Sequence, residues 1–155
     1  MNSAFYLLAF CAGAGLSAQA VINARLASAL AGNTLVAAVV SFCVGLSLLI
    51  IAAIWRGGLI AALAQLPMQP LWIFAGGVLG AVFLFSTAFL APRIGLTNML
   101  VLIIAGQLLM SVSIDHFGWF GALAHPALPI RLIGVTVVLA GVLLTLFGDR
   151  LSSFK

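Results

Sequence analysis

Charged residues are scarce in this sequence, and the scarcity excludes a water-soluble fold. Only 5% of the 155 residues are charged, whereas 65% are hydrophobic. A soluble domain devotes about 25% of its residues to charged side chains, because it must cover its apolar core with a polar surface. The composition therefore predicts an integral membrane protein with no room for a soluble domain.

Glutamate is absent, and the only acidic residues are Asp115 and Asp149. The chain also lacks a Gly-Lys-Thr phosphate loop and a nucleophile spaced to meet a base. His116 and His125 with one aspartate are too few ligands to indicate a metal site. We therefore expect no catalytic residue, no cofactor and no metal ion, and no ATP-driven transport by this chain alone.

Cysteines are few, and clusters of basic residues are missing. Cys11 and Cys43 both lie in apolar runs, where we interpret them as packing residues rather than a disulfide or a metal pair. The net charge of +4 comes from basic residues spread singly along the chain, so none of them forms a patch that could follow a phosphate backbone. Nucleic acid is not an expected partner. The cations are interpreted as anchors at the membrane interface: Arg25, Arg56, Arg93, Arg131, Arg150 and Lys155.

The sequence does contain five long apolar runs. A helix rises about 1.5 Å per residue, so about 20 apolar residues cross roughly 30 Å of hydrocarbon. We therefore predict an all-α polytopic membrane protein, a single domain over 1–155 embedded in membrane lipid. Its transmembrane helices are expected at about 3–24, 33–55, 70–91, 97–115 and 131–148.

The segments between these runs are short. The first loop is expected at about Arg25–Gly32 and the third at Pro92–Leu96. Between the second and third spans, Leu59–Leu66 is expected to form a short interfacial helix before Pro67.

Five crossings would place the two termini on opposite sides of the membrane. Two basic residues then fall on the N-terminal side and four on the C-terminal side, so the positive-inside rule favours an outward N-terminus and a cytoplasmic C-terminus. Because this bias is small, insertion in both orientations remains open.

Amide and hydroxyl groups inside the spans are the first candidates for a binding site. Gln19 and Asn23 are four residues apart and share a face of the first helix, while Gln107 and Ser111 share a face of the fourth. An amide in hydrocarbon costs several kcal/mol unless it is hydrogen-bonded. These side chains therefore either bond to a neighbouring helix or line a cavity, and in the second case we expect all four to contact substrate.

Charged groups at the ends of the same helices are candidates for coupling or gating. Asp115 follows Gln107 and Ser111 at the same spacing and is the one carboxylate that could lie within the bilayer. It could carry a proton, or it could be solvated or paired with Arg131. Arg25, next to Asn23, could adjust charge at an entrance.

Three glycines mark the last helix. Gly134, Gly141 and Gly148 are seven residues apart, so they form one stripe along the helix. Small residues let helices approach closely in lipid. The stripe indicates either an oligomer contact or packing within the chain.

Three segments share a pattern with a known family. They are Gln19-Ala-Val-Ile-Asn23-Ala-Arg25-Leu26, then Gly106-Gln107-Leu108 with Ser111 and Asp115-His116-Phe117-Gly118, then Arg131-Leu-Ile-Gly134 with Gly141-Val142. In this order they resemble the YdcZ-type family of small bacterial inner-membrane proteins, which belongs to the drug/metabolite transporter superfamily. The resemblance covers essentially the whole chain.

The resemblance has implications for assembly. Larger, EamA-like members of the superfamily have ten helices in two five-helix repeats of opposite orientation, so this chain resembles one half. An antiparallel homodimer or a paralogous half would complete it. The last helix is similar to the dimerising helix of small multidrug resistance proteins. Those proteins carry an essential glutamate in the first helix, whereas this chain has Gln19 and Asn23, so their proton-exchange mechanism is not expected here.

Taken together, these features predict a secondary transporter that exports a small metabolite or drug across the bacterial inner membrane by alternating access. The first, third and fourth helices are expected to line its site. One alternative is a flippase for a lipid-linked substrate. Another is a non-transporting scaffold or assembly subunit, in which Gln19 and Gln107 would be tightly packed with no cavity beside them.

Overall fold

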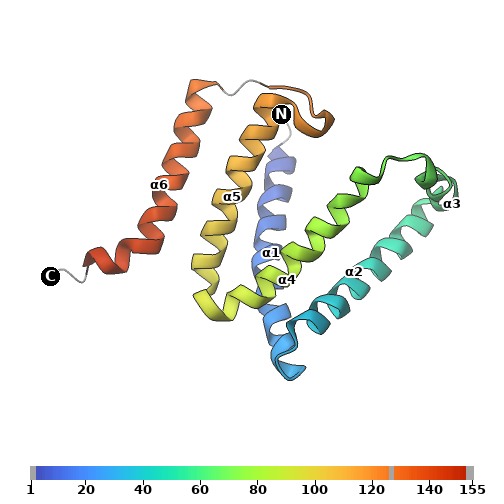
Figure 1. Ribbon diagram of the computed structural model, residues 1–155, viewed down its shortest axis with the longest axis horizontal. Coiled ribbons are helices and arrows are strands. Elements are labelled where there is room, and N and C mark those ends of the chain that lie inside the picture. The colour runs from blue at the N-terminus through green and yellow to red at the C-terminus, as the bar shows by residue number, and fades with distance from the viewer. Residues whose placement is uncertain (1–2, 126–127, 153–155) are drawn as a thin grey trace. The chain divides into compact units, whose positions relative to one another are not determined.

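The computed structural model in Figure 1 describes the backbone of residues 3–125 and 128–152 and the side chains as far as 148. Five of its helices are long and apolar enough to cross a membrane, which confirms the predicted all-α polytopic fold. Lys155 and the side chain of Arg150, both counted as interface anchors, lie outside the described part. The pairing of two chains into a ten-helix unit stays a prediction.

The chain divides into two compact units, Met1–Arg93 and Ile94–Lys155. The first unit contains the first three of the long helices with the short elements that join them, and the second contains the last two with the turn between them. Each unit is described by itself.

The first helix continues past its predicted end. α1 spans Ser3–Ala29, so Arg25 lies within the helix and the predicted loop at Arg25–Gly32 begins too early. Arginine has a good helix propensity and removes no backbone hydrogen bond, so its charge does not end a helix. The chain turns only at Ala31 and Gly32, where φ is 55° and 82°.

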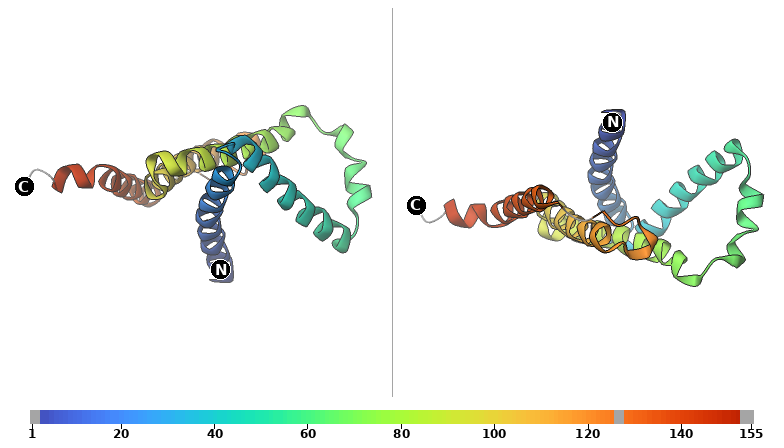
Figure 2. Two further views of the ribbon diagram at one scale, coloured as in Figure 1. Left: turned by 90° about the horizontal axis from the view of Figure 1, so that it is seen from below. Right: turned by 90° about the horizontal axis from the view of Figure 1, so that it is seen from above.

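Hydrogen bonds close the turn between α1 and α2. The Gly32 N–H donates to the Ala27 carbonyl at 2.9 Å, a bond typical of a helix C-terminus. The Asn33 side-chain oxygen accepts the Val36 N–H at 3.1 Å and caps α2, which spans Thr34–Arg56. α1 and α2 are in contact beside this turn and diverge away from it (Figure 2).

A short connecting segment joins the far end of α2 to α4 (Figure 2). α3 spans Leu59–Leu63, and two 3-10 turns follow, η1 at Leu66–Met68 and η2 at Leu71–Phe74. The short helix predicted at Leu59–Leu66 is thus present but ends earlier. α4 spans Ala75–Ile94.

α4 also continues past its predicted end. Pro92 lies inside the helix, so the third loop, predicted at Pro92–Leu96, begins too early. Proline donates no backbone N–H, so α4 loses one hydrogen bond at Pro92 and ends two residues later. Beside this gap the Arg93 guanidinium donates to the Phe89 carbonyl. Gly95, with φ at 81°, then separates α4 from α5.

Small residues dominate the buried part of the first unit. Leu84 is the one large apolar side chain among them, and two polar residues, Asn23 and Thr87, are buried as well. Small residues let helix backbones approach closely, which supplies packing energy where lipid removes the hydrophobic drive. The buried alanines are Ala20 and Ala27 on α1, Ala37 and Ala38 on α2, and Ala88 and Ala91 on α4.

Large apolar side chains lie on the outside of the helices instead. On α2, for example, Leu48, Leu49 and Ile51 are exposed. Only 11% of the residues in the apolar window of α2 are buried. Exposed leucine and isoleucine are favourable against lipid, because acyl chains are as apolar as they are. This outward placement agrees with a membrane environment.

The second unit is a helical hairpin (Figure 1). α5 spans Leu96–Phe117, α6 spans Pro129–Ser152, and the two are in contact. α5 ends at Gly118, whose φ of 65° lies in the left-handed region, and the 3-10 turn η3 follows at Trp119–Gly121. A Cβ added at Gly118 would lie 3.2 Å from the Ala122 carbonyl oxygen, so this turn requires glycine.

Candidate functional site

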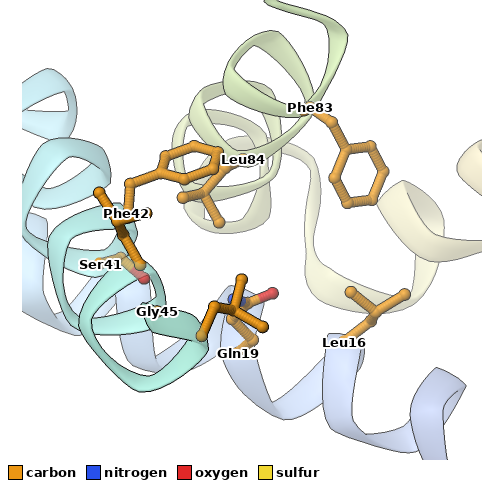
Figure 3. Close-up of a pocket in the computed structure, with 10 residues that line it drawn as sticks. Leu16, Gln19, Ser41, Phe42, Gly45, Phe83 and Leu84 are labelled. Atoms are coloured by element: carbon orange, nitrogen blue, oxygen red, sulfur yellow. The ribbon is translucent and has the colours of Figure 1, made fainter. Parts of the chain in front are cut away.

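An open groove of about 460 Å³ runs between α1, α2 and α4 of the first unit (Figure 3). Leu16 and Gln19 reach it from α1, and Leu84 reaches it from α4. α2 contributes Ser41 and Phe42. The groove follows from the divergence of α1 and α2 beyond their shared turn.

Two polar side chains face this groove from opposite walls. Gln19 carries an amide on α1, and Ser41 carries a hydroxyl on α2, while the remaining lining side chains are apolar. Gln19 is exposed to the groove rather than packed against a neighbouring helix. The arrangement can accept an apolar molecule and offer it hydrogen bonds from two sides.

Asn23 occupies a different environment from Gln19, although the two share a helix face. Its side chain is only 2% exposed, between the buried residues Ala20 and Ala27 of the same face. The side-chain nitrogen Nδ2 is buried and has no hydrogen-bond partner within the described residues. A buried amide donor left without an acceptor costs about 1–3 kcal/mol, so an acceptor from outside the first unit would stabilise Asn23.

The other predicted contact residues belong to the second unit. Gln107 is exposed on α5, and the Ser111 hydroxyl donates to the Leu108 carbonyl of its own helix at 3.0 Å. A serine satisfied in this way carries little information about substrate. The shared site of Gln19, Asn23, Gln107 and Ser111 therefore stays a prediction, with two members in each unit.

Asp115 forms an ion pair with Arg131, one of the alternatives left open by the sequence. The Asp115 Oδ2 atom lies 2.5 Å from the Arg131 Nη2 atom, and both side chains are partly exposed. The backbone carbonyl of Asp115 also accepts the His125 N–H at 2.7 Å. Asp115 thus connects the end of α5 to the loop and to the start of α6. A coupling role for Asp115, like a gating role for the exposed Arg25, stays a prediction.

The glycine stripe of α6 is open within its own unit. A Cβ added at Gly134, Gly141 or Gly148 would have no neighbouring atom of the α5–α6 hairpin within 4 Å. The α5–α6 contact therefore uses another face of α6. Among the described residues, no group of three metal-binding side chains is present.

That α2 lines the groove was not predicted from the sequence. Ser41 and Gly45 on α2 line the groove, whereas the first, third and fourth helices were expected to form the site. Ser41 and Gly45 are four residues apart and so share a helix face. This polar-small pair was the signal available in a mostly apolar run that also contains Ser47.

Comparison with known proteins identifies a family that covers most of the chain. The family model DMT_YdcZ, described as "Putative inner membrane exporter, YdcZ", matches residues 4–144, which include the groove, the Asp115–Arg131 pair and most of α6. No curated protein and no solved structure matches the chain.

Proposed function

This chain belongs to the YdcZ family of inner-membrane exporters, as its three sequence motifs predicted, and we propose that it is a secondary transporter for a small metabolite or drug. It is a multi-pass protein of the inner membrane with five membrane-spanning helices. Transport would proceed by alternating access around the groove between α1, α2 and α4. Substrate would bind there to Gln19 and Ser41.

The observation that carries this proposal is the open groove with the exposed Gln19 amide. A scaffold subunit would bury and satisfy such an amide, because an unsatisfied amide is costly in hydrocarbon. A transporter needs a cavity near mid-membrane with a few polar groups that bind and release a ligand. The position of Gln19, in the second half of α1, and its exposure to the groove support the transporter.

A single five-helix chain is the counterpart of half of a ten-helix transporter. An antiparallel homodimer or a paralogous half would supply the inverted repeat that alternating access uses. The open glycine stripe on α6 supports a contact between two copies at this helix. The near balance of arginines on the two sides supports insertion in both orientations.

Reconstitution in liposomes tests the transporter directly. Wild-type protein should move at least one member of a broad metabolite panel, with or without a pH gradient. Gln19→Leu should lower that flux by about tenfold, the factor for one lost hydrogen bond of about 1.4 kcal/mol. Gln65→Leu is the matched control, because it removes an amide from the connecting segment of the same unit.

A panel without any transported member would count against the exporter. Equal flux from the Gln19 and Gln65 variants would keep the exporter but remove Gln19 from its site.

A flippase for a lipid-linked substrate is a second candidate, favoured by the apolar walls of the groove. A further hollow of about 330 Å³ on the other side of Phe42 is lined by apolar side chains and Cys43. An acyl chain could lie in either hollow while a polar head meets Gln19. Movement of fluorescent lipid-linked substrates between leaflets, with no flux of water-soluble compounds, would favour this candidate.

A further inference from the structure

The first unit carries positive charge without any acidic residue. Residues 1–93 contain Arg25, Arg56 and Arg93 but no aspartate or glutamate. Both acidic residues of the chain, Asp115 and Asp149, belong to the second unit. Within the first unit, an arginine can therefore be neutralised only by a group from outside that unit.

One of these arginines lines a cavity. A hollow of about 310 Å³, here called the vestibule, lies where the end of α1, the start of α2 and the end of α4 meet. Arg93, Ser28 and Thr34 supply its polar groups, and Ala24 and Ala88 contribute to its apolar walls. Polar atoms make up a much larger share of this lining than of the groove lining.

Contacts within α4 hold the Arg93 guanidinium in place. It donates from Nη1 to the Phe89 carbonyl, and its central carbon lies 3.4 Å from the centre of the Phe89 ring. A guanidinium has five N–H donors, so most of them remain for a ligand. An arginine positioned in this way loses little conformational entropy when it binds a carboxylate or phosphate.

Three helix ends border the vestibule, and their partial charges differ in sign. The start of α2 at Thr34 carries a partial positive charge of about half a unit, whereas the ends of α1 and α4 carry partial negative charges of similar size. The positive potential of the vestibule therefore comes from the full charge of Arg93.

The unpartnered amide of Asn23 lies between the vestibule and the groove along α1. Leu16 and Gln19 line the groove, whereas Ala24 and Ala27 line the vestibule. The buried Nδ2 of Asn23 has no acceptor among the described residues, and Asn23 itself lines neither hollow. It marks an unsatisfied polar group between the two hollows.

We propose that the vestibule binds the acidic group of an organic anion through Arg93, with the apolar body of the ligand directed toward the groove. This inference rests on the proposed export function, and it names the substrate class: small amphiphilic carboxylates or phosphate monoesters. Arg93 binds the charge of the ligand, and Ser28 and Thr34 are the other polar residues of the vestibule lining.

Binding to purified protein in nanodiscs of zwitterionic phosphatidylcholine tests the proposal without any transport step. The probes are 4-phenylbutyrate, phenyl phosphate and the neutral 4-phenylbutyramide, titrated by calorimetry. The two anions should bind more tightly than the amide, and rising salt should weaken them. Arg93→Gln should weaken both anions by about tenfold or more, because it removes charge-assisted hydrogen bonds.

Two variants make the result specific. Arg93→Lys should restore part of the affinity, because the charge is kept while the planar fork is lost. Arg56→Gln removes the same charge at the far end of α2 and should leave the affinity for the anions unchanged. Equal effects of Arg93→Gln and Arg56→Gln, or equal binding of the amide and the acid, would overturn the proposal.

Nanodiscs containing anionic phosphatidylglycerol separate a substrate site from a lipid contact. If Arg93→Gln affects only stabilisation by phosphatidylglycerol, and neither aromatic anion binds, Arg93 contacts a lipid headgroup and the proposal fails. The export function has a separate test. Flux of neutral compounds unaffected by Arg93→Gln would overturn only the anion site, whereas anion binding without any flux would contradict only export.

Discussion

The two units of the chain treat their polar groups in different ways. In the first unit, three arginines have no acidic residue beside them in the sequence, and the Asn23 amide is buried without a partner. In the second unit, Asp115 pairs with Arg131 and also accepts a backbone N–H from its loop. Polar groups that lack partners can bind a ligand, whereas satisfied ones stabilise a hairpin. We infer that the first unit recognises substrate and the second supports assembly.

The packing of small residues also differs between the two units. Alanines are buried on α1, α2 and α4 of the first unit, where α1 and α2 are in contact, and hollows lie along the same helices. In the second unit the glycine stripe of α6 has no neighbour within the hairpin. An open stripe of small residues is the arrangement expected if a second copy covers α6.

The largest expected effect is on assembly. Gly141→Leu should convert purified dimer to monomer, because a leucine on the stripe prevents two α6 helices from approaching closely. Gel filtration with light scattering measures the mass. Thr136→Leu, a change to the same residue at an exposed position on the side of α6 away from the stripe, is the control and should leave the dimer intact. A dimer that survives Gly141→Leu would place the oligomer contact on another surface.

The next effect tests close packing in the first unit. Ala37 is fully buried, so Ala37→Leu should destabilise the protein by about 1–3 kcal/mol through overpacking. Ala52→Leu changes an exposed alanine of the same helix and should have little effect. Thermal unfolding in detergent compares the two variants. Similar melting temperatures would show that the alanine contacts do not govern the stability of this unit.

An effect of similar size is expected at the turn of the second unit. Gly118→Ala should cost about 1–3 kcal/mol, because it combines a left-handed backbone with close contacts to Ala122 and Ala124. Gly121→Ala meets only the backbone cost, since no atom lies within 4 Å of its added Cβ. The difference between the two melting temperatures isolates the contacts. A larger loss at Gly121 than at Gly118 would contradict the described turn.

The smallest effect should come from the ion pair. Asp115 and Arg131 are partly exposed, so solvent screening limits their coupling to about 1 kcal/mol or less. A double-mutant cycle with Asp115→Asn and Arg131→Gln measures this coupling from unfolding. If Asp115→Asn instead abolishes transport while stability is unchanged, Asp115 couples transport, and the contrast between the two units is lost.

Much of the fold could be predicted because hydropathy is a local property. A run such as Thr34–Arg56 crosses the membrane for reasons contained in its own residues, and α2 begins one residue after its predicted start. The ends at Arg25 and Pro92 were wrong because both residues were treated as helix boundaries. A helix ends where the backbone turns, as at Gly32, and a charge or a late proline does not make that turn.

The candidate site could be predicted only in part. Because an amide in lipid needs a partner, Gln19 was expected either to bond to a neighbouring helix or to line a cavity, and it lies in the lining of the groove. Asn23 has the same chemistry and shares the helix face, yet it is buried. The difference depends on how closely the neighbouring helices approach α1 at each of these two residues. Ser41 lines the groove and Arg93 lines the vestibule for the same reason.

By itself, the sequence determined the membrane environment, the five spans, the family and the absence of acidic residues from residues 1–93, because each depends on residue type and order alone. The tertiary structure decided which polar groups meet a hollow, which are buried and which are paired. Those outcomes depend on distances between helices that diverge from a turn. The hydropathy of the residues, summed along the sequence, carries no information about the distances between helices.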